Sequence, residues 1–166
     1  GHGTRLRPLT HTGPKQLLPI ANKPMSEYCL ESIIETGIKD IAIIGNRFIG
    51  QIAQHIGAGL EGENIHYVLE EEPKGVGHAL NLARPHVEGK RLLIYFSDNI
   101  TSAELDEEVR RWGDSEEEPG AFLLGRVVED PRAFGVGVLD EEEKLIDIVE
   151  KPENPTSNLA VIGVYF

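Results

Sequence analysis

The sequence predicts an α/β fold in which a mostly parallel sheet is flanked by helices and followed by a β-rich C-terminal half. In the first two thirds of the chain, short apolar runs alternate with amphipathic segments of helical period. In the remainder, strand-like runs follow one another without a helical pattern between them. With 166 residues, 40% of them hydrophobic, the chain can build a substantial core, and we expect residues 1–166 to form a single domain.

Helices in the first part are indicated by apolar residues three or four positions apart, as at Ile49, Ile52 and Ile56. Prolines and glycines mark helix ends, and Gly37 is placed to end the first helix. In order, we expect a helix over 24–35, a strand over 41–45, a helix over 48–56, a strand over 65–69, a helix from Gly75 to about residue 83, a strand over 92–96 and a helix that begins with a capping box of Thr101 and Glu104.

The C-terminal part is predicted to contain strands alone. Each of its apolar runs is bounded by glycine, proline or acidic residues, as expected for strands joined by turns. No repeat or low-complexity linker separates it from the first part, which supports the single domain. The expected strands cover residues 121–128, 135–139, 145–149 and 159–166.

The formal net charge of −12 argues against a general nucleic-acid binder or a protein that binds anionic membranes. Much of the acidity lies in runs, and those at 116–118 and 141–143 are expected to be solvated. A cluster of Arg5, Arg7 and Lys15 stands out against this background. An acidic chain that gathers cations in one glycine-containing loop is expected to use them on an anion.

A single cysteine, Cys29, excludes an internal disulfide and favours a cytoplasmic protein. Its apolar neighbours indicate core packing rather than chemistry. No apolar run is long enough to span a bilayer, and no secretory signal is visible, so we expect no membrane partner. The six histidines show no metal-ligand spacing and are expected to be surface or packing residues. Both ends of the chain look cut.

The first residues combine several features that suit a polyphosphate. Gly1 and Gly3 allow backbone N–H groups to approach an anion without a Cβ in the way. Thr4 and Arg5, with Arg7, add a hydroxyl and two guanidinium groups that match phosphate oxygens. Lys15 follows a rigid proline and adds a point charge. The alternative interpretation is a turn whose charges are solvated.

A longer motif that includes these residues favours the polyphosphate site over the solvated turn. Gly1-x-Gly-Thr-Arg-Leu-Arg-Pro-Leu-Thr, followed by Pro14-Lys-Gln-Leu-Leu-Pro-Ile-Ala-Asn-Lys-Pro24, resembles the signature of sugar-1-phosphate nucleotidylyltransferases. The likeness is greatest to glucose-1-phosphate thymidylyltransferases. It implies a Rossmann-like sheet of the nucleotide-diphospho-sugar transferase type, lacking here its first strand and its C-terminal part. It also implies NTP and sugar 1-phosphate as substrates, Mg²⁺ as cofactor, and a homo-oligomer.

The resemblance also assigns roles to individual residues. Catalytic roles fall to Arg5, Lys15 and Asp98, and Asp98 would hold the metal. Nucleotide binding is expected at Gly1, Gly3, Thr4, Arg5, Gln16, Glu70 and Gly75. Binding of the sugar phosphate is expected at Asn99, Gly135, Glu150, Lys151, Val161 and Tyr165.

For two of these groups, the sequence also gives a physical reason that does not depend on the resemblance. Asp98 follows the strand over 92–96, and ligands of open α/β sheets bind at the carboxyl ends of strands. Its carboxylate suits Mg²⁺ beside phosphate oxygens, whereas the alternative is a turn or a helix cap. Glu150 and Lys151 close another strand and would contact sugar hydroxyls and the phosphate. The alternative for this pair is a surface ion pair before a loop proline.

Glu70 departs from the family pattern, in which thymidylyl- and uridylyltransferases usually carry glutamine. A carboxylate only accepts hydrogen bonds, whereas an amide also donates. Glu70 could accept from N3–H of thymine or uracil, or from both N1–H and N2–H of guanine. Transfer from dTTP or UTP to glucose 1-phosphate is therefore the first expectation. The alternatives are a mannose-1-phosphate guanylyltransferase, a non-catalytic regulatory homologue and, for segment 69–77, a solvated acidic turn.

Overall fold

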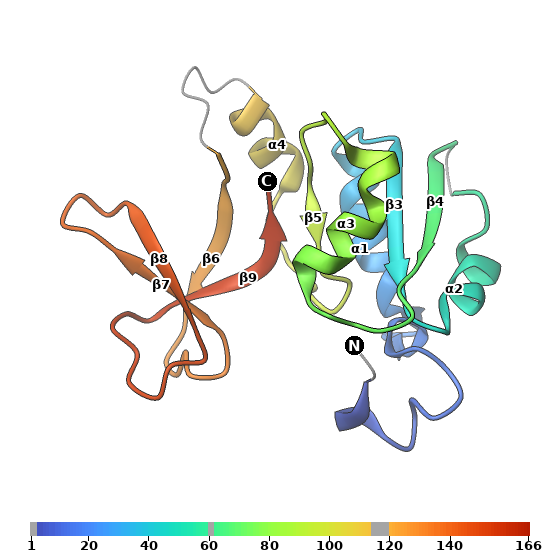
Figure 1. Ribbon diagram of the computed structural model, residues 1–166, viewed down its shortest axis with the longest axis horizontal. Coiled ribbons are helices and arrows are strands. Elements are labelled where there is room, and N and C mark those ends of the chain that lie inside the picture. The colour runs from blue at the N-terminus through green and yellow to red at the C-terminus, as the bar shows by residue number, and fades with distance from the viewer. Residues whose placement is uncertain (1–2, 60–61, 114–119) are drawn as a thin grey trace. The chain divides into compact units, whose positions relative to one another are not determined.

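The computed structural model describes residues 3–59, 62–113 and 120–166. The chain divides into two compact units. Unit 1 comprises Gly1–Arg91 and Ile100–Gly113, and unit 2 comprises Leu92–Asn99 and Asp114–Phe166. The predicted α/β class is confirmed, with the described helices in unit 1 and an antiparallel sheet in unit 2 (Figure 1). Two compact units can belong to one domain, so the single domain stays a prediction.

Unit 1 is built around two parallel strands with helices on both faces. Its elements are the 3₁₀ helices η1 (Thr4–Leu6) and η2 (Lys15–Leu17), strands β1 (Pro19–Ile20) and β2 (Lys23–Pro24), α1 (Met25–Glu35), β3 (Asp40–Gly45), α2 (Ile49–Ile56), β4 (Asn64–Leu69), α3 (Val76–Val87) and α4 (Leu105–Gly113). The β1–β2 hairpin was not expected from the sequence. It turns at Ala21 and Asn22, which both adopt positive φ.

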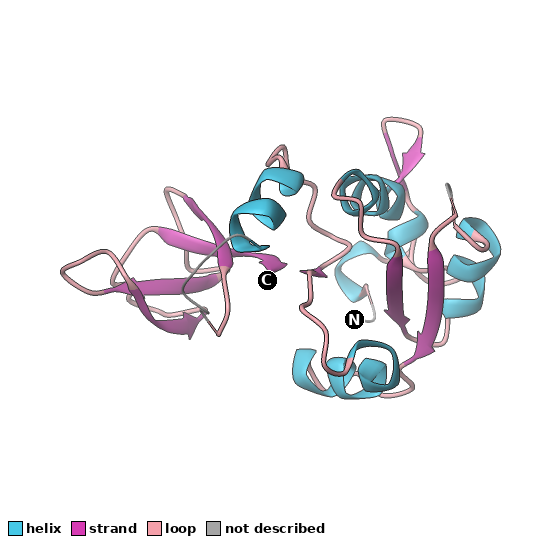
Figure 2. Cartoon of the chain, turned by 90° about the horizontal axis from the view of Figure 1, so that it is seen from above, coloured by secondary structure: helices cyan, strands magenta, loops and turns pink. Residues whose placement is uncertain are grey.

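The parallel pairing of β3 with β4 sets the core of unit 1. Ile41 pairs with Ile65 and Ile43 with Tyr67, so these side chains share one face of the two-stranded sheet. All four belong to or pack against a core cluster that is completed by Leu30 of α1 and by Ile52 and Ile56 of α2. On the opposite face, the ring of His66 stacks on that of His86 from α3 at 4.1 Å between centroids. Helices therefore cover both faces of the pair (Figure 2).

Unit 2 is an antiparallel sheet in which β9 is the central strand. Its strands are β5 (Ile94–Tyr95), β6 (Leu123–Val127), β7 (Gly135–Leu139), β8 (Leu145–Glu150) and β9 (Leu159–Tyr165). Strands β5, β6 and β7 all pair with β9, and β8 pairs with β7. Val136, Ala160 and Val164 form its most deeply buried apolar part. Among the described residues, parallel pairing is confined to β3 and β4, which is less than the sequence analysis expected, because hydrophobic period does not encode strand direction.

Most predicted element boundaries lie within two residues of the observed ones, but two features differ. Helix α3 continues through Pro85 to Val87, beyond the expected end near residue 83. The expected capping box is wrong, since α4 begins only at Leu105. The hydroxyl of Thr101 instead accepts a hydrogen bond from the N–H of Ala103 at 3.0 Å. Threonine side chains readily make such local turns in place of helix caps. Among the described residues, no helix combines the length and apolar character needed to cross a bilayer.

Leu30 provides a test of the core assignment in unit 1. It is 4% exposed and contacts both β3 and α2 through the core cluster, so Leu30→Ala leaves a cavity. We expect a loss of about 2–4 kcal/mol in the free energy of unfolding, measured by urea denaturation. The matched control is Leu9→Ala, because Leu9 is 67% exposed and its loss should cost less than about 0.5 kcal/mol. Equal losses in the two variants would contradict the assignment.

Candidate functional site

The N-terminal loop, defined here as residues 3–18, is closed by a buried hydroxyl. Thr10 is buried, and its Oγ1 donates a hydrogen bond to the carbonyl oxygen of Gly3 at 2.7 Å. Gly3 has a φ of +62°, and a Cβ there would lie 3.2 Å from Cγ2 of Thr10. Both the backbone conformation and the close contact therefore require glycine at this position.

The same loop presents the predicted cations. Arg5 and Arg7 are exposed, and Lys15 begins η2 directly after the extended Pro14. Gln16, also predicted, is half-buried in η2. The backbone of Thr4 lies in η1, whereas its side chain and the whole of Gly1 lie outside the described residues.

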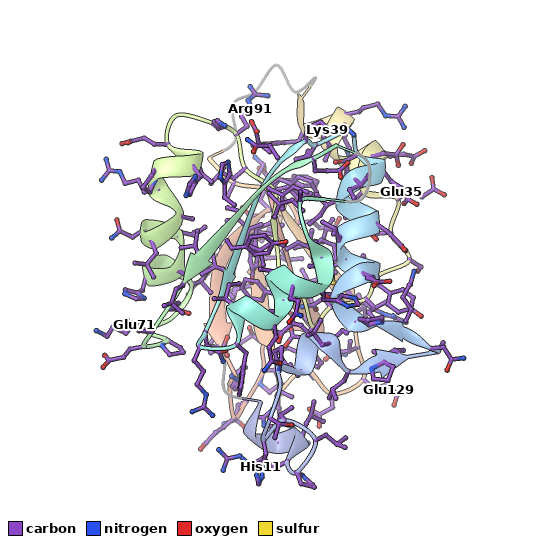
Figure 3. The ribbon with its side chains drawn as sticks, turned by 90° about the vertical axis from the view of Figure 1, so that its right-hand side faces the viewer. His11, Glu35, Lys39, Glu71, Arg91 and Glu129 are labelled. Carbon is purple, nitrogen blue, oxygen red and sulfur yellow. The ribbon has the colours of Figure 1, made fainter. Side chains whose placement is uncertain are left out.

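Gln51 fastens this loop to α2, a contact that was not expected from the sequence. Its Nε2 donates to the carbonyl oxygen of Thr12 at 3.0 Å, and a Cβ at Gly13 would lie 3.2 Å from its Oε1. Gln51 belongs to α2, which follows the carboxyl end of β3. Figure 3 shows His11 of the loop and Glu71, which follows β4, toward one end of unit 1, with Lys39, which precedes β3, toward the other. No local pattern signals a contact that spans 39 residues.

The carboxyl end of β4 leads into segment 69–77, in which Glu70 is predicted to contact the base. The N–H of Glu70 donates to the carbonyl oxygen of Gly45 at 2.8 Å and so extends the β3–β4 ladder by one residue. The side chain of Glu70 is only 12% exposed, and its Oε1 lies 2.9 Å from Nδ1 of His78 in the first turn of α3. From the sequence, His78 was expected to be a surface or packing residue. The structure gives it, in addition, a polar contact with Glu70.

Gly75 lies immediately before α3 and adopts a φ of +100°. No atom lies within 4 Å of a Cβ built there, so the backbone conformation alone requires glycine. No side chain caps this helix start. Backbone N–H groups at an uncapped helix N-terminus are able to donate to an incoming polar group.

In unit 2, the predicted metal ligand Asp98 follows β5 in a tight turn against β9. The side-chain Nδ2 of Asn99 donates to Oδ1 of Asp98 at 3.2 Å and to the carbonyl oxygen of Phe96 at 3.3 Å. Oδ1 of Asn99 accepts a hydrogen bond from the N–H of Gly163 at 3.4 Å. Asn99, predicted to bind the sugar phosphate, is thus placed to orient the carboxylate of Asp98.

Gly163 makes this turn possible, and the sequence analysis missed it. A Cβ at Gly163 would lie 2.6 Å from Nδ2 of Asn99 and 2.7 Å from Cβ of Phe96. The signal was available, because a glycine inside an apolar strand often marks a close approach of another segment.

The sequence predicts Asp98 as a ligand of Mg²⁺. The described residues contain no group of three His, Cys, Asp or Glu side chains that could hold a metal ion. Mg²⁺ commonly takes one or two carboxylates and completes its shell with water and substrate phosphates. The exposed carboxylate of Asp98 fits that requirement.

Three residues predicted to bind the sugar phosphate lie in one row across the sheet of unit 2. Gly135 pairs with Glu150 on one side and with Val161 on the other. A Cβ at Gly135 would lie 3.3 Å from Oε2 of Glu150, so glycine leaves this carboxylate room. Lys151 has a φ of +45° and its Nζ lies 2.6 Å from Oε1 of Glu150. The exposed ion pair that was the alternative interpretation is therefore present.

Tyr165 lies at the end of β9 and packs its ring against Phe96, with 5.5 Å between centroids. Burial raises the pKa of Tyr165 above its ordinary value, and the negative charge of Glu150 raises it further. The phenol therefore keeps its proton and can donate a hydrogen bond over a wide pH range.

The nucleotidyl transferase family matches residues 1–166, which is the whole chain. The chain belongs to this family. It is 39% identical to a glucose-1-phosphate thymidylyltransferase of Streptomyces antibioticus, over 100% of the chain and 47% of that protein. A uridylyltransferase of Haloferax volcanii that uses UTP and glucose 1-phosphate is 32% identical over 99% of the chain and 68% of its own length.

Solved structures agree with these relatives. A candidate glucose-1-phosphate thymidylyltransferase from Bacillus anthracis, in complex with sucrose, has a TM-score of 0.92 at 34% identity and covers 99% of this chain and 67% of its own. A UDP-glucose pyrophosphorylase in complex with UDP-glucose has a TM-score of 0.86 at 26% identity. The family resemblance expected from the sequence is confirmed. The chain spans about half the length of the first curated relatives it matches.

Gly163→Ala tests the packing that holds the Asp98 turn. The added methyl would overlap Phe96 and Asn99, and we expect a loss of about 1–3 kcal/mol in stability. The amide of Phe96, which donates to the carbonyl oxygen of Gly163, should exchange its hydrogen faster. Gly120→Ala is the control in the same unit, because a Cβ there meets no atom within 4 Å. Unchanged exchange at Phe96 in Gly163→Ala would contradict this account.

Ionisation of Tyr165 tests the proximity of Glu150. Glu150→Gln should lower the pKa of Tyr165 toward its ordinary 10.0 but leave it raised, since burial is the larger cause. Because the pKa of Tyr165 is higher in the folded than in the unfolded chain, the unfolded chain loses the phenol proton at a lower pH. The contribution of Tyr165 to stability is therefore present below pH 10 and is lost as the pH rises above it. Ultraviolet absorbance titration, with Tyr165→Phe subtracted to assign the signal, measures the shift. An identical titration in Glu150→Gln would show that the charge has no influence.

Proposed function

We propose that this chain belongs to an enzyme that transfers a nucleotidyl group from an NTP to a sugar 1-phosphate, with formation of an NDP-sugar and release of pyrophosphate. The first choice of substrates is dTTP or UTP with glucose 1-phosphate. One observation carries the proposal: an otherwise acidic chain gathers Arg5, Arg7 and Lys15 in a glycine-containing loop that Gln51 ties to α2, the helix that follows the carboxyl end of β3. Relatives that act on these substrates support the same function.

The chemistry is an in-line displacement at phosphorus. A phosphate oxygen of the sugar 1-phosphate forms a bond to the α-phosphorus of the NTP, and the bond from that phosphorus to pyrophosphate breaks. No covalent intermediate with the protein is needed, so the contribution of the protein is positioning and charge stabilisation. Arg5 and Lys15 neutralise the negative charge that develops on the leaving pyrophosphate.

Residues of unit 2 would bind the second substrate and the metal. Lys151 pairs with the phosphate of the sugar, Glu150 accepts hydrogen bonds from sugar hydroxyls, and Tyr165 donates one. Gly135 and Val161 line the same row of the sheet. Enzymes of this family generally use a divalent metal ion. Asp98, oriented by Asn99, would hold Mg²⁺, which when bound neutralises phosphate charge.

Two other functions differ from this one. The first uses other substrates, and the second involves no turnover. Transfer of a guanylyl group to mannose 1-phosphate is favoured by the carboxylate of Glu70, which is able to accept two hydrogen bonds. A regulatory homologue would bind sugar nucleotide without releasing pyrophosphate. A panel of dTTP, UTP and GTP with glucose and mannose 1-phosphates, assayed for pyrophosphate, distinguishes all three. The expected homo-oligomeric state and cytoplasmic location remain predictions, to be checked by light scattering and by cell fractionation.

Lys15→Ala tests the catalytic assignment in the full-length protein. Loss of one positioned cation should lower kcat for pyrophosphate release by about 100-fold or more. The matched control is Lys90→Ala, because Lys90 pairs with Asp40 at the amino end of β3, the opposite end of the strand from α2. We expect Lys90→Ala to retain turnover close to that of the unmodified protein.

Near-normal turnover in Lys15→Ala would overturn the role of the loop. Equal losses in Lys15→Ala and Lys90→Ala would also overturn it, since the effect would then follow from total charge rather than from position.

A further inference from the structure

Glu70 and His78 form a hydrogen-bonded pair that was not predicted from the sequence. The two residues are eight apart in the sequence, and their contact closes the segment that joins β4 to α3. Glu70 is the first residue after a parallel strand, at the edge where open α/β sheets bind ligands. His78 is in the first turn of α3, three residues after the positive-φ Gly75. Glu70 therefore lies in segment 69–77, where contact with the base is expected, and His78 directly follows that segment.

The hydrogen bond between them has a defined direction. An ionised carboxylate can only accept hydrogen bonds, so Nδ1 of His78, 2.9 Å from Oε1 of Glu70, is the donor. No other described residue hydrogen-bonds to the carboxylate of Glu70. Oε1 thus has one of its two lone pairs engaged within the protein, whereas both lone pairs of Oε2 remain as acceptors.

This asymmetry matters for the choice of base. Guanine presents two donors on its Watson–Crick edge, N1–H and N2–H, and a carboxylate reads both with its two oxygens. Thymine and uracil present one donor, N3–H, between two carbonyl groups. Because Oε1 already accepts a hydrogen bond from His78, it is a weaker partner for the second donor of guanine, and the carboxylate matches the single donor of thymine or uracil better.

We propose that His78 is a positioning residue that makes Glu70 select thymine or uracil over guanine. The inference rests on the proposed function, within which it decides between the pyrimidine and guanine alternatives that Glu70 leaves open. Glu70 is then the group that contacts the base, and His78 acts through it by holding Oε1.

The test is the ratio of kcat/KM for dTTP to that for GTP, measured on the full-length protein with a saturating sugar 1-phosphate. A ratio within one sample is unaffected by the fraction of protein that is folded. His78→Ala frees Oε1, and the ratio should fall about tenfold or more, the scale of one hydrogen bond to a charged group. The change should appear in KM rather than in kcat, because base contacts bind substrate and transition state alike.

Two further variants separate the hydrogen bond from a structural effect. His78→Asn places an amide N–H where Nδ1 stood, so it should keep the ratio within about threefold of the original. The control is His55→Ala, because His55 makes a similar contact with Glu27, 2.7 Å from Nε2 to Oε1, between α2 and α1. It should leave the ratio unchanged.

The outcomes distinguish this inference from the proposed function. Turnover with the same ratio in His78→Ala, or an equally low ratio in His78→Asn, overturns the role of His78 and leaves the enzyme assignment intact. Absence of turnover with every NTP overturns the proposed function. In that case, equilibrium binding of dTTP and GTP to the same variants still measures the preference, and equal loss of both nucleotides in His78→Ala overturns the role of the pair.

Discussion

The parallel pairing of β3 with β4 is the constraint on which the arrangement of unit 1 depends. Because the two strands run in the same direction, both chains leave the sheet at the same edge. One exit leads to α2, whose Gln51 holds the N-terminal loop, and the other leads to Glu70. A slip of one residue would move Ile41 and Ile43 out of the core. The hydrophobic core therefore enforces the register that places the polar groups.

The net charge of the chain and its cluster of cations act over different distances. A net charge of −12 repels large polyanions such as nucleic acids. That field is screened over about 8 Å at physiological ionic strength, so a bound anion responds mainly to its nearest neighbours. In the proposed function, Arg5, Arg7 and Lys15 of the N-terminal loop would supply those neighbours. An acidic protein can thus offer a site to a small polyphosphate.

In unit 2, packing and the candidate site depend on the same strand. Strand β9 pairs with three others, and its Gly163 lets the turn at Asn99 lie against it without a side chain between them. Val161 and Tyr165 of this strand are among the predicted sugar-site residues. Substitutions in β9 therefore affect the stability of the sheet and the orientation of Asp98 together.

The sequence by itself determined the class of fold, most element boundaries, the family and the segments that carry Arg5, Asp98 and Glu150. Hydrophobic period, turn residues and a long contiguous motif are local properties that the chain order preserves. The tertiary structure decided the antiparallel pairing around β9 and the contacts made by Gln51, His78 and Gly163. Such contacts join residues 8 to 64 positions apart. They depend on how strands and helices pack in space, which no local pattern specifies.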